Sequence, residues 1–176
     1  MPAGAPGRAR ELDDELGSQA ASIILPSSRE VLARVRNYLL AQNDRADGRN
    51  NVYKDLRSGT SGNVVTISLG PLFDKGPTDS HFYLTSNSRL SFGITLREAN
   101  GRCSLIAYRF HLHLPEGSAS SFYRFDLNPR PHDTPLREPR CHLHPGSDDM
   151  RLPCPPLSPL GVLDRIFLVI EPTLSS

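Results

Sequence analysis

The chain has 176 residues, the size of one ordinary domain, with 38% hydrophobic residues, 16 prolines and no tryptophan. This composition is too apolar for full disorder, and the absence of a sustained heptad or longer period excludes a coiled coil, a collagen-like chain and a repeat solenoid. The formal net charge of +1, from 20 basic and 19 acidic residues, provides no global field that would attract nucleic acid or a membrane.

The sequence also bears on cellular location. The longest unbroken apolar run, residues 166–170, is far shorter than the roughly twenty residues that a membrane-spanning helix needs. The three cysteines are odd in number and widely spaced, which is unlike a secreted disulfide framework. The N-terminus carries arginines but no apolar stretch of the kind found in signal peptides. We therefore expect a cytoplasmic protein with no membrane partner.

The N-terminal quarter of the chain divides into an arm and a helix. Residues 1–20 contain proline, glycine and a mixed-charge run, and we expect them to form a flexible arm, followed by a single domain over residues 21–176. Within that domain, residues 21–50 are expected to form a helix and a connecting loop. Ser27 and Glu30 make an S-x-x-E capping box at the start of the helix. Apolar residues follow at helical spacing: Val31, Leu32, Val35, Leu39 and Leu40.

Residues 60–127 change to a period of two, which predicts a β-meander. The strand candidates are residues 64–69, 81–85, 89–97, 105–114 and 122–127. The link Ala99-Asn100-Gly101 suits a three-residue hairpin loop, and such a loop would set Ile94 opposite Ile106. The matching apolar faces of the strands indicate an antiparallel sheet with one face on a core and the other in water.

The last part of the chain combines a loop with a helix. Residues 128–157 are rich in histidine and proline and have no regular period, so we expect a long loop. Ser158 and Pro159 then begin a helix over residues 158–170, with a cap followed by proline at the first helical position. The predicted fold class is α+β, a meandering antiparallel β-sheet of four to five strands with an N-terminal and a C-terminal helix packed on one face.

The polar face of the predicted 105–114 strand carries the first candidate site. Alternation places Arg109, His111 and His113 on this face, and it places Arg124 and Asp126 of the next strand on the same side. If paired residue numbers sum to 235, His111 faces Arg124 and Arg109 faces Asp126. A histidine can exchange a proton with a ribose 2′-hydroxyl or a leaving oxygen, while arginine holds the phosphate. The alternative is a solvated strand face with cross-strand ion pairs.

The loop at residues 128–157 allows three interpretations. One of its histidines, His142 or His144, could join the surface described above. The segment could instead be a plain histidine-bearing surface loop. Its histidines and cysteines could also supply zinc ligands: His132, Cys141, His142, His144 and Cys154. Because their spacing fits no standard zinc knuckle or ribbon, we expect no metal and no other cofactor.

The run from Tyr123 to Pro129, followed by His132 and then by His142-Leu143-His144, resembles the TumE-like toxins of bacterial toxin–antitoxin modules. The resemblance covers roughly residues 89–168, about half of the chain. The matching positions are Tyr123, Arg124, Asp126, Pro129 and His132 in the first motif and His142 and His144 in the second. This chain departs from the family pattern in its N-terminal extension and in Cys141, where the family tends to have histidine. The resemblance implies a growth-arresting protein that acts on RNA and is held in check by a cognate antitoxin.

The strand pattern and the resemblance together predict a toxin-like protein with metal-independent ribonuclease activity. His111 and His144 are the predicted acid–base pair, and Arg124 and Asp126 complete the catalytic set. Five further residues are predicted to contact the substrate: Arg109, His113, Tyr123, His132 and His142. The alternative is a non-catalytic interaction module that binds a protein or nucleic-acid partner through the sheet face and the proline-rich loop.

Overall fold

The computed structural model describes residues 24–25, 27–42, 44–70, 81–100, 102–129 and 140–171, so the predicted arm at residues 1–20 lies outside the described residues. Nine strands of the described part form one antiparallel sheet. They are β1 (Ile24–Leu25), β2 (Leu56–Ser61), β3 (Val64–Leu69), β4 (Phe82–Tyr83), β5 (Arg89–Ala99), β6 (Arg102–His113), β7 (Phe122–Leu127), β8 (Cys141–Pro145) and β9 (Leu152–Pro153). The helices are α2 (Ser28–Leu40), α3 (Val52–Asp55) and α4 (Pro159–Asp164), and α4 continues as the π-helix η1 (Arg165–Ile170).

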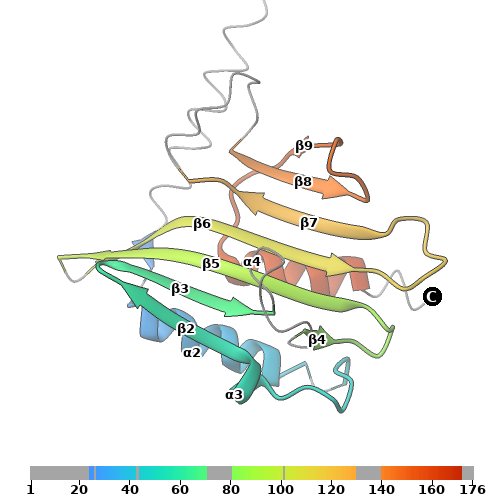
Figure 1. Cartoon of the computed structure of the whole chain (residues 1–176), viewed down its shortest axis with the longest axis horizontal. Helices are drawn as coiled ribbons and strands as arrows, with labels where there is room; N and C mark the ends of the chain where they lie inside the picture. The colour runs from blue at the N-terminus through green and yellow to red at the C-terminus, as the bar shows by residue number, and fades with distance from the viewer. Residues whose placement is uncertain are drawn as a thin grey trace, which may run out of the picture.

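The strands follow one another across the sheet almost in chain order, as a meander does. Their order is β2-β3-β5-β6-β7-β8-β9, while β4 pairs with β5 and β1 pairs with β6 (Figure 1). The predicted class, α+β, is confirmed, but the predicted number of four to five strands is too low. Among the described helices, none is long and apolar enough to cross a membrane.

The helices and the inward side chains of the strands share one apolar core. Figure 1 shows α2 and α4 behind the sheet, and the face of the sheet away from them is called the outer face below. Ser27 caps α2 as the sequence predicts, because its Oγ accepts a hydrogen bond from the Glu30 amide at 3.2 Å. Tyr38 of α2 donates a hydrogen bond to Asp164 of α4 at 2.8 Å, and its ring centroid lies 5.9 Å from that of Phe167. The two helices therefore contact each other as well as the sheet.

The long β5–β6 hairpin differs in register from the predicted one. Ala99 pairs with Arg102, so the link has two residues rather than three. A β-bulge farther along the hairpin leaves Ile106 without an opposite residue, and Ile94 consequently faces Tyr108 instead of Ile106. Such a bulge adds one residue to one strand. The sequence hides it because the residues around it are apolar whichever register is chosen.

Two strands lie inside the segment that the sequence predicts to be a structureless loop. β8 pairs with β7 from Cys141 to Pro145, and β9 pairs with β8. The prediction of a continuous loop over residues 128–157 is therefore wrong for the described residues from 140 onward. The reason is that β8 buries both its apolar and its histidine side chains, so no contrast between a dry and a wet face is visible in its sequence.

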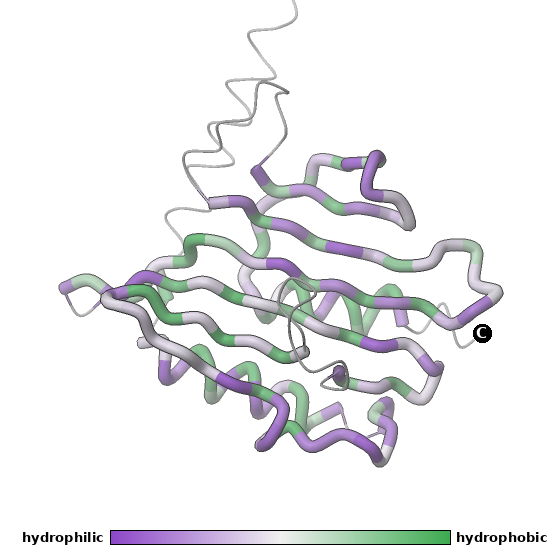
Figure 2. Tube along the Cα trace, in the orientation of Figure 1, coloured by the Kyte–Doolittle hydropathy of each residue, from purple (hydrophilic) through white to green (hydrophobic). Residues whose placement is uncertain are grey.

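The sequence does not predict β2, and it predicts one continuous C-terminal helix where the structure has two helical types. Apart from Leu56, the side chains of β2 are exposed, and its small polar residues show no alternation (Figure 2). The predicted helix over 158–170 begins correctly, with Ser158 Oγ accepting a hydrogen bond from the Gly161 amide at 3.1 Å. Its second half is nevertheless a π-helix. α3 is a third, four-residue helix that the sequence did not indicate.

Candidate active site on the outer face of the sheet

Ionisable side chains of three neighbouring strands meet on the outer face. Between β6 and β7, Arg109 is paired with Asp126. In the same ladder His111 is paired with Arg124, so the predicted register of these two strands is confirmed. β8 lies on the other side of β7 and adds two histidines. We call the whole group the outer-face cluster: Arg109, His111, Arg124, Asp126, His142 and His144.

Asp126 lies at the centre of the outer-face cluster, and its side chain is only 5% exposed. Its Oδ1 accepts a hydrogen bond from Arg109 Nε at 3.1 Å, and its Oδ2 accepts one from Arg124 Nε at 2.8 Å. The side chain of Arg124 is 14% exposed, whereas that of Arg109 is 46% exposed. The pair with Arg124 is therefore largely removed from water, and water screens much of the pair with Arg109.

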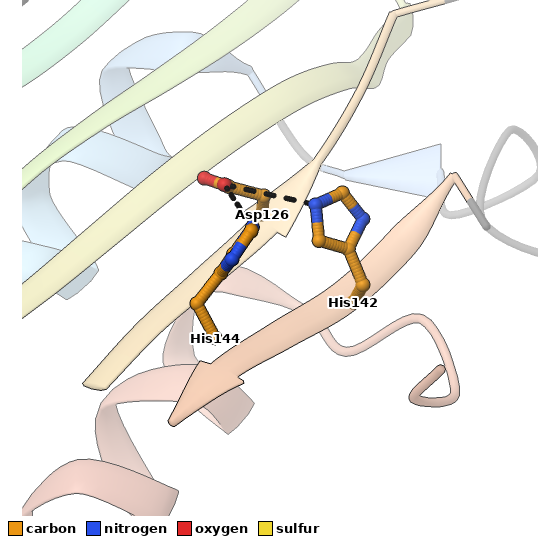
Figure 3. A group of neighbouring side chains, drawn as sticks. All are labelled: Asp126, His142 and His144. Carbon is orange, nitrogen blue, oxygen red and sulfur yellow. Dashed lines mark ion pairs between the residues drawn. The ribbon is translucent and has the colours of Figure 1, made fainter. Parts of the chain in front are cut away.

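The two histidines of β8 face the same carboxylate (Figure 3). The Nε2 atoms of His142 and His144 lie 3.8 and 3.5 Å from Asp126 Oδ2. His144 Nδ1 lies 3.2 Å from the carbonyl oxygen of Ser147, and because a carbonyl only accepts, Nδ1 carries the hydrogen. Burial lowers the pKa of His144, and Arg124 lowers it further.

Burial separates the histidines of β8 from those of β6. His142 and His144 are 3% and 1% exposed, so neither ring is well placed to meet a substrate. His111 and His113 of β6 are only partly buried, and their rings stack with centroids 3.8 Å apart. His144 is thus more deeply buried than His111 and His113, and its acid–base role stays a prediction.

His111 has an unusual environment. Its ring packs edge-on against that of Phe122, with the ring centroids 4.9 Å apart. Within the described part of the chain its buried Nε2 makes no hydrogen bond. Burial lowers the pKa of His111 to about 3, and the neighbouring charges of His113 and Arg124 contribute to this shift. The ring is therefore neutral near pH 7 and binds a proton less readily than an ordinary histidine. Buried polar atoms without a partner are uncommon, and they often mark functional positions.

Asp148, in the turn after β8, is a member of the site that the sequence did not reveal. Its Oδ1 accepts a hydrogen bond from Arg124, and this bond lowers the pKa of Asp148. The side chain of Asp148 is 72% exposed, although its partner is mostly buried. The acidic pair Asp148-Asp149 beside the histidines was the only available signal, and loop residues follow no period that would place them.

Three other residues, Tyr123, His132 and His81, lie outside the outer-face cluster as defined above. Tyr123, a predicted substrate contact, lies on the opposite side of β7 from Arg124 because neighbouring residues of a strand alternate in direction, so it is not part of the cluster. His132 lies outside the described residues. His81, for which the sequence predicts no role, is 9% exposed, and its ring centroid lies 6.0 Å from that of His113.

The cysteines considered as zinc ligands lie apart from the histidines. Cys141 belongs to the apolar core, and its Sγ lies 3.2 Å from Cys154 Sγ and 3.5 Å from Tyr108 Oη. The hydrogen bond from the Cys154 thiol lowers the pKa of Cys141 to about 7. Alternation along β8 directs His142 to the other face, so the described members of the mixed cysteine–histidine set are not brought together.

Comparisons with known proteins do not identify the chain: no family model, no curated protein and no solved structure matches it. The resemblance to TumE-like toxins therefore stays a prediction. What the outer-face cluster can do must be argued from its own residues. Together with the neighbouring His113, which stacks on His111, the two arginines and Asp126 of the cluster suit proton transfer next to a bound anion.

Proposed function

We propose that the chain is a cytoplasmic toxin-like protein that cleaves RNA on the outer face of its sheet. The observation that carries this proposal is the stacked pair His111–His113 beside two arginines that share the carboxylate of Asp126. RNA supplies both a hydroxyl group that loses a proton and a phosphate that gains charge during cleavage. Imidazole and guanidinium are the side chains suited to these two tasks.

The proposed reaction uses His111 as the base. Its ring is neutral, and its buried Nε2 would have to be uncovered when RNA binds in order to accept the proton of the ribose 2′-hydroxyl. The 2′-oxygen then attacks phosphorus. The bond from phosphorus to the 5′-oxygen breaks, and that leaving oxygen takes a proton from His113, which must enter the reaction in its protonated form. Burial and Arg89 lower the pKa of His113, so the reaction should be faster on the acidic side of neutrality. Arg109 and Arg124 offset the charge that develops on the phosphate oxygens.

Asp148 supports an anion-binding role for Arg124. An exposed carboxylate already sits on this arginine, and a phosphate of RNA offers the same charge and the same kind of acceptor oxygen. Exposed ion pairs contribute little stability, so displacing Asp148 costs at most about 1 kcal/mol. Asp126 would keep Arg124 in place during the exchange through the bond to Nε.

Cleavage of a labelled single-stranded RNA, compared with DNA of the same sequence, tests the proposal. The wild type should cleave RNA alone, because DNA lacks the attacking 2′-hydroxyl. His111→Ala should lower the rate by about 10²–10⁴-fold. Arg57→Ala, which changes an exposed arginine of the edge strand β2, is the matched control and should leave the rate unchanged. Intact RNA with folded wild type, or full activity of His111→Ala, would refute the proposal.

A growth assay extends the test to cells. Expression of the wild type from a tight inducible promoter should arrest bacterial growth, and the His111→Ala variant at equal soluble level should not. Co-expression of a cognate antitoxin should relieve the arrest. Unaffected growth with soluble wild type would count against the toxin function.

A non-catalytic interaction module is the second candidate function. The burial of Asp126, His142 and His144 favours it, because a fixed network of buried charges can hold a sheet face rigid for docking. This module would retain a protein or nucleic-acid partner through the outer face and the proline-rich segment. Binding of RNA by the wild type with no cleavage product would favour this candidate over the nuclease.

A further inference from the structure

Asp126, His142 and His144 form a buried triad between β7 and β8 (Figure 3). One donor atom from each residue lies within 4.8 Å of the other two, and the three residues are 4%, 3% and 1% exposed. The proposed nuclease does not use the two histidines of this triad. Two imidazoles aimed at one buried carboxylate therefore need an explanation of their own.

His144 is oriented as metal-binding histidines commonly are. Its Nδ1–H donates to the carbonyl oxygen of Ser147, so in the neutral ring the lone pair of Nε2 is on the side of Asp126. A lone pair directed at a carboxylate oxygen 3.5 Å away is unfavourable, and either a second proton on the ring or a metal cation between the two atoms removes this repulsion. Metal-bound histidines commonly donate their second ring N–H to a backbone carbonyl in this way.

The carboxylate is supported as metal-binding carboxylates usually are. Arg109 donates to Oδ1 of Asp126, and Arg124 donates to Oδ2, which fixes the plane of the group. Each carboxylate oxygen has two acceptor sites, so Oδ2 can bind an ion in addition to Arg124. Asp148 balances the charge of Arg124, and the two arginines are thus matched by two aspartates before any ion binds.

We propose that Asp126, His142 and His144 bind one divalent transition-metal ion of the zinc class. Zinc–ligand distances of about 2.0–2.1 Å place tetrahedral ligands about 3.3 Å apart. The separations of 3.8 and 3.5 Å from the two Nε2 atoms to Oδ2 are close to that value. All three donor atoms lie within 4.8 Å of one another, so the side chains would have to draw together around the ion. Three protein ligands leave a fourth position for water or an anion.

The donor set selects among metal ions. Imidazole nitrogen favours zinc, copper, nickel and cobalt, whereas magnesium and calcium prefer sites made of oxygen. The site differs from the mixed cysteine–histidine set considered from the sequence, because Cys141 faces the core. It also goes beyond the proposed nuclease, since ion binding by the triad requires no RNA and no acid–base role of His111 or His113.

Metal analysis of the full-length chain tests the proposal. Protein stripped with a chelator and dialysed against zinc should retain one ion per chain, and the cobalt form should show the visible absorption of four-coordinate cobalt. The double variant His142→Gln/His144→Gln should lose this retention. The matched control His111→Gln/His113→Gln removes two imidazoles from the neighbouring strand at the same spacing and should still retain one zinc ion.

A second measurement covers the case in which the buried double variant fails to fold. X-ray absorption of the wild-type cobalt form should show two imidazole ligands and one or more oxygen ligands, and zinc should raise the melting temperature whereas magnesium should not. Absence of zinc retention by the wild type would overturn the proposal. Retention by His142→Gln/His144→Gln, or its loss in the control pair alone, would do the same. None of these readouts depends on RNA cleavage, so the metal site and the nuclease can fail separately.

Discussion

Replacing Asp126 with Asn should destabilise the protein far more than the loss of an ordinary surface charge. The substitution keeps the size of the side chain but removes the charge shared by Arg109 and Arg124. It also sets an amide N–H against a guanidinium N–H in a place that is only 5% exposed. Breaking a buried ion pair by removing one partner costs about 3–5 kcal/mol. The side chain of Arg109 is 46% exposed, so the loss of its ion pair adds at most about 1 kcal/mol to this cost.

Asp148→Asn provides the matched control, because Asp148 binds the same Arg124 from a position that is 72% exposed. This variant should lose no more than about 1 kcal/mol of unfolding free energy. For a chain of this size, Asp126→Asn should lower the melting temperature by about 6–20 °C. Urea unfolding followed by circular dichroism, with a chelator present so that no metal contributes, measures both changes. Equal losses in the two variants, or a loss below about 1 kcal/mol for Asp126→Asn, would refute the inference that burial makes this network strong.

Three further predictions concern charge, protonation and thiols. Asp148→Ala should strengthen RNA binding by up to about fivefold in a low-salt filter assay, because it frees Arg124 for phosphate, and an unchanged affinity would contradict this role. Burial lowers the pKa of His111 to about 3 in the folded protein, so as the pH falls the unfolded chain binds a proton at this residue before the folded protein does. The free energy of unfolding should therefore fall between about pH 6.5 and pH 3. In a plot of the urea midpoint against pH, His111→Gln should reduce the slope over this range. Mild oxidation should join Cys141 to Cys154, whose sulfur atoms lie 3.2 Å apart, and mass spectrometry of the digested protein should find that cross-link and not one to Cys103.

Some parts of the fold follow from local sequence patterns. Ser27 caps α2 because its hydroxyl group reaches the Glu30 amide, an interaction that needs no tertiary contact. The alternation of apolar and polar residues fixed which side chains of β6 and β7 share a face. The pairing of His111 with Arg124 followed from matching those faces, and the structure confirms it.

Other parts depend on contacts that no single strand encodes. The bulge at Ile106 moves the β5–β6 register, and nothing in an apolar run marks the extra residue. His142 and His144 belong to a strand paired with β7 and are buried on the outer face of the sheet, although their sequence resembles that of an exposed loop. Asp148 reaches Arg124 from a turn, and only the folded chain brings them together.

The order of the strands has a consequence for how the protein is made. Along the main path of the sheet every strand after β2 except β5 lies next to the strand that precedes it in the chain, and β5 lies next to β3. From β5 to β9 the sheet can therefore grow one strand at a time as the polypeptide leaves the ribosome. The outer-face cluster needs β6, β7 and β8 together, and β8 comes late in the chain. An emerging chain that has reached β7 therefore has Arg109, His111, Arg124 and Asp126 but not the two histidines of β8. Premature termination before Cys141 should consequently yield a chain that keeps the proposed nuclease residues of β6 and β7 but lacks Asp148 and the two histidines of the metal site.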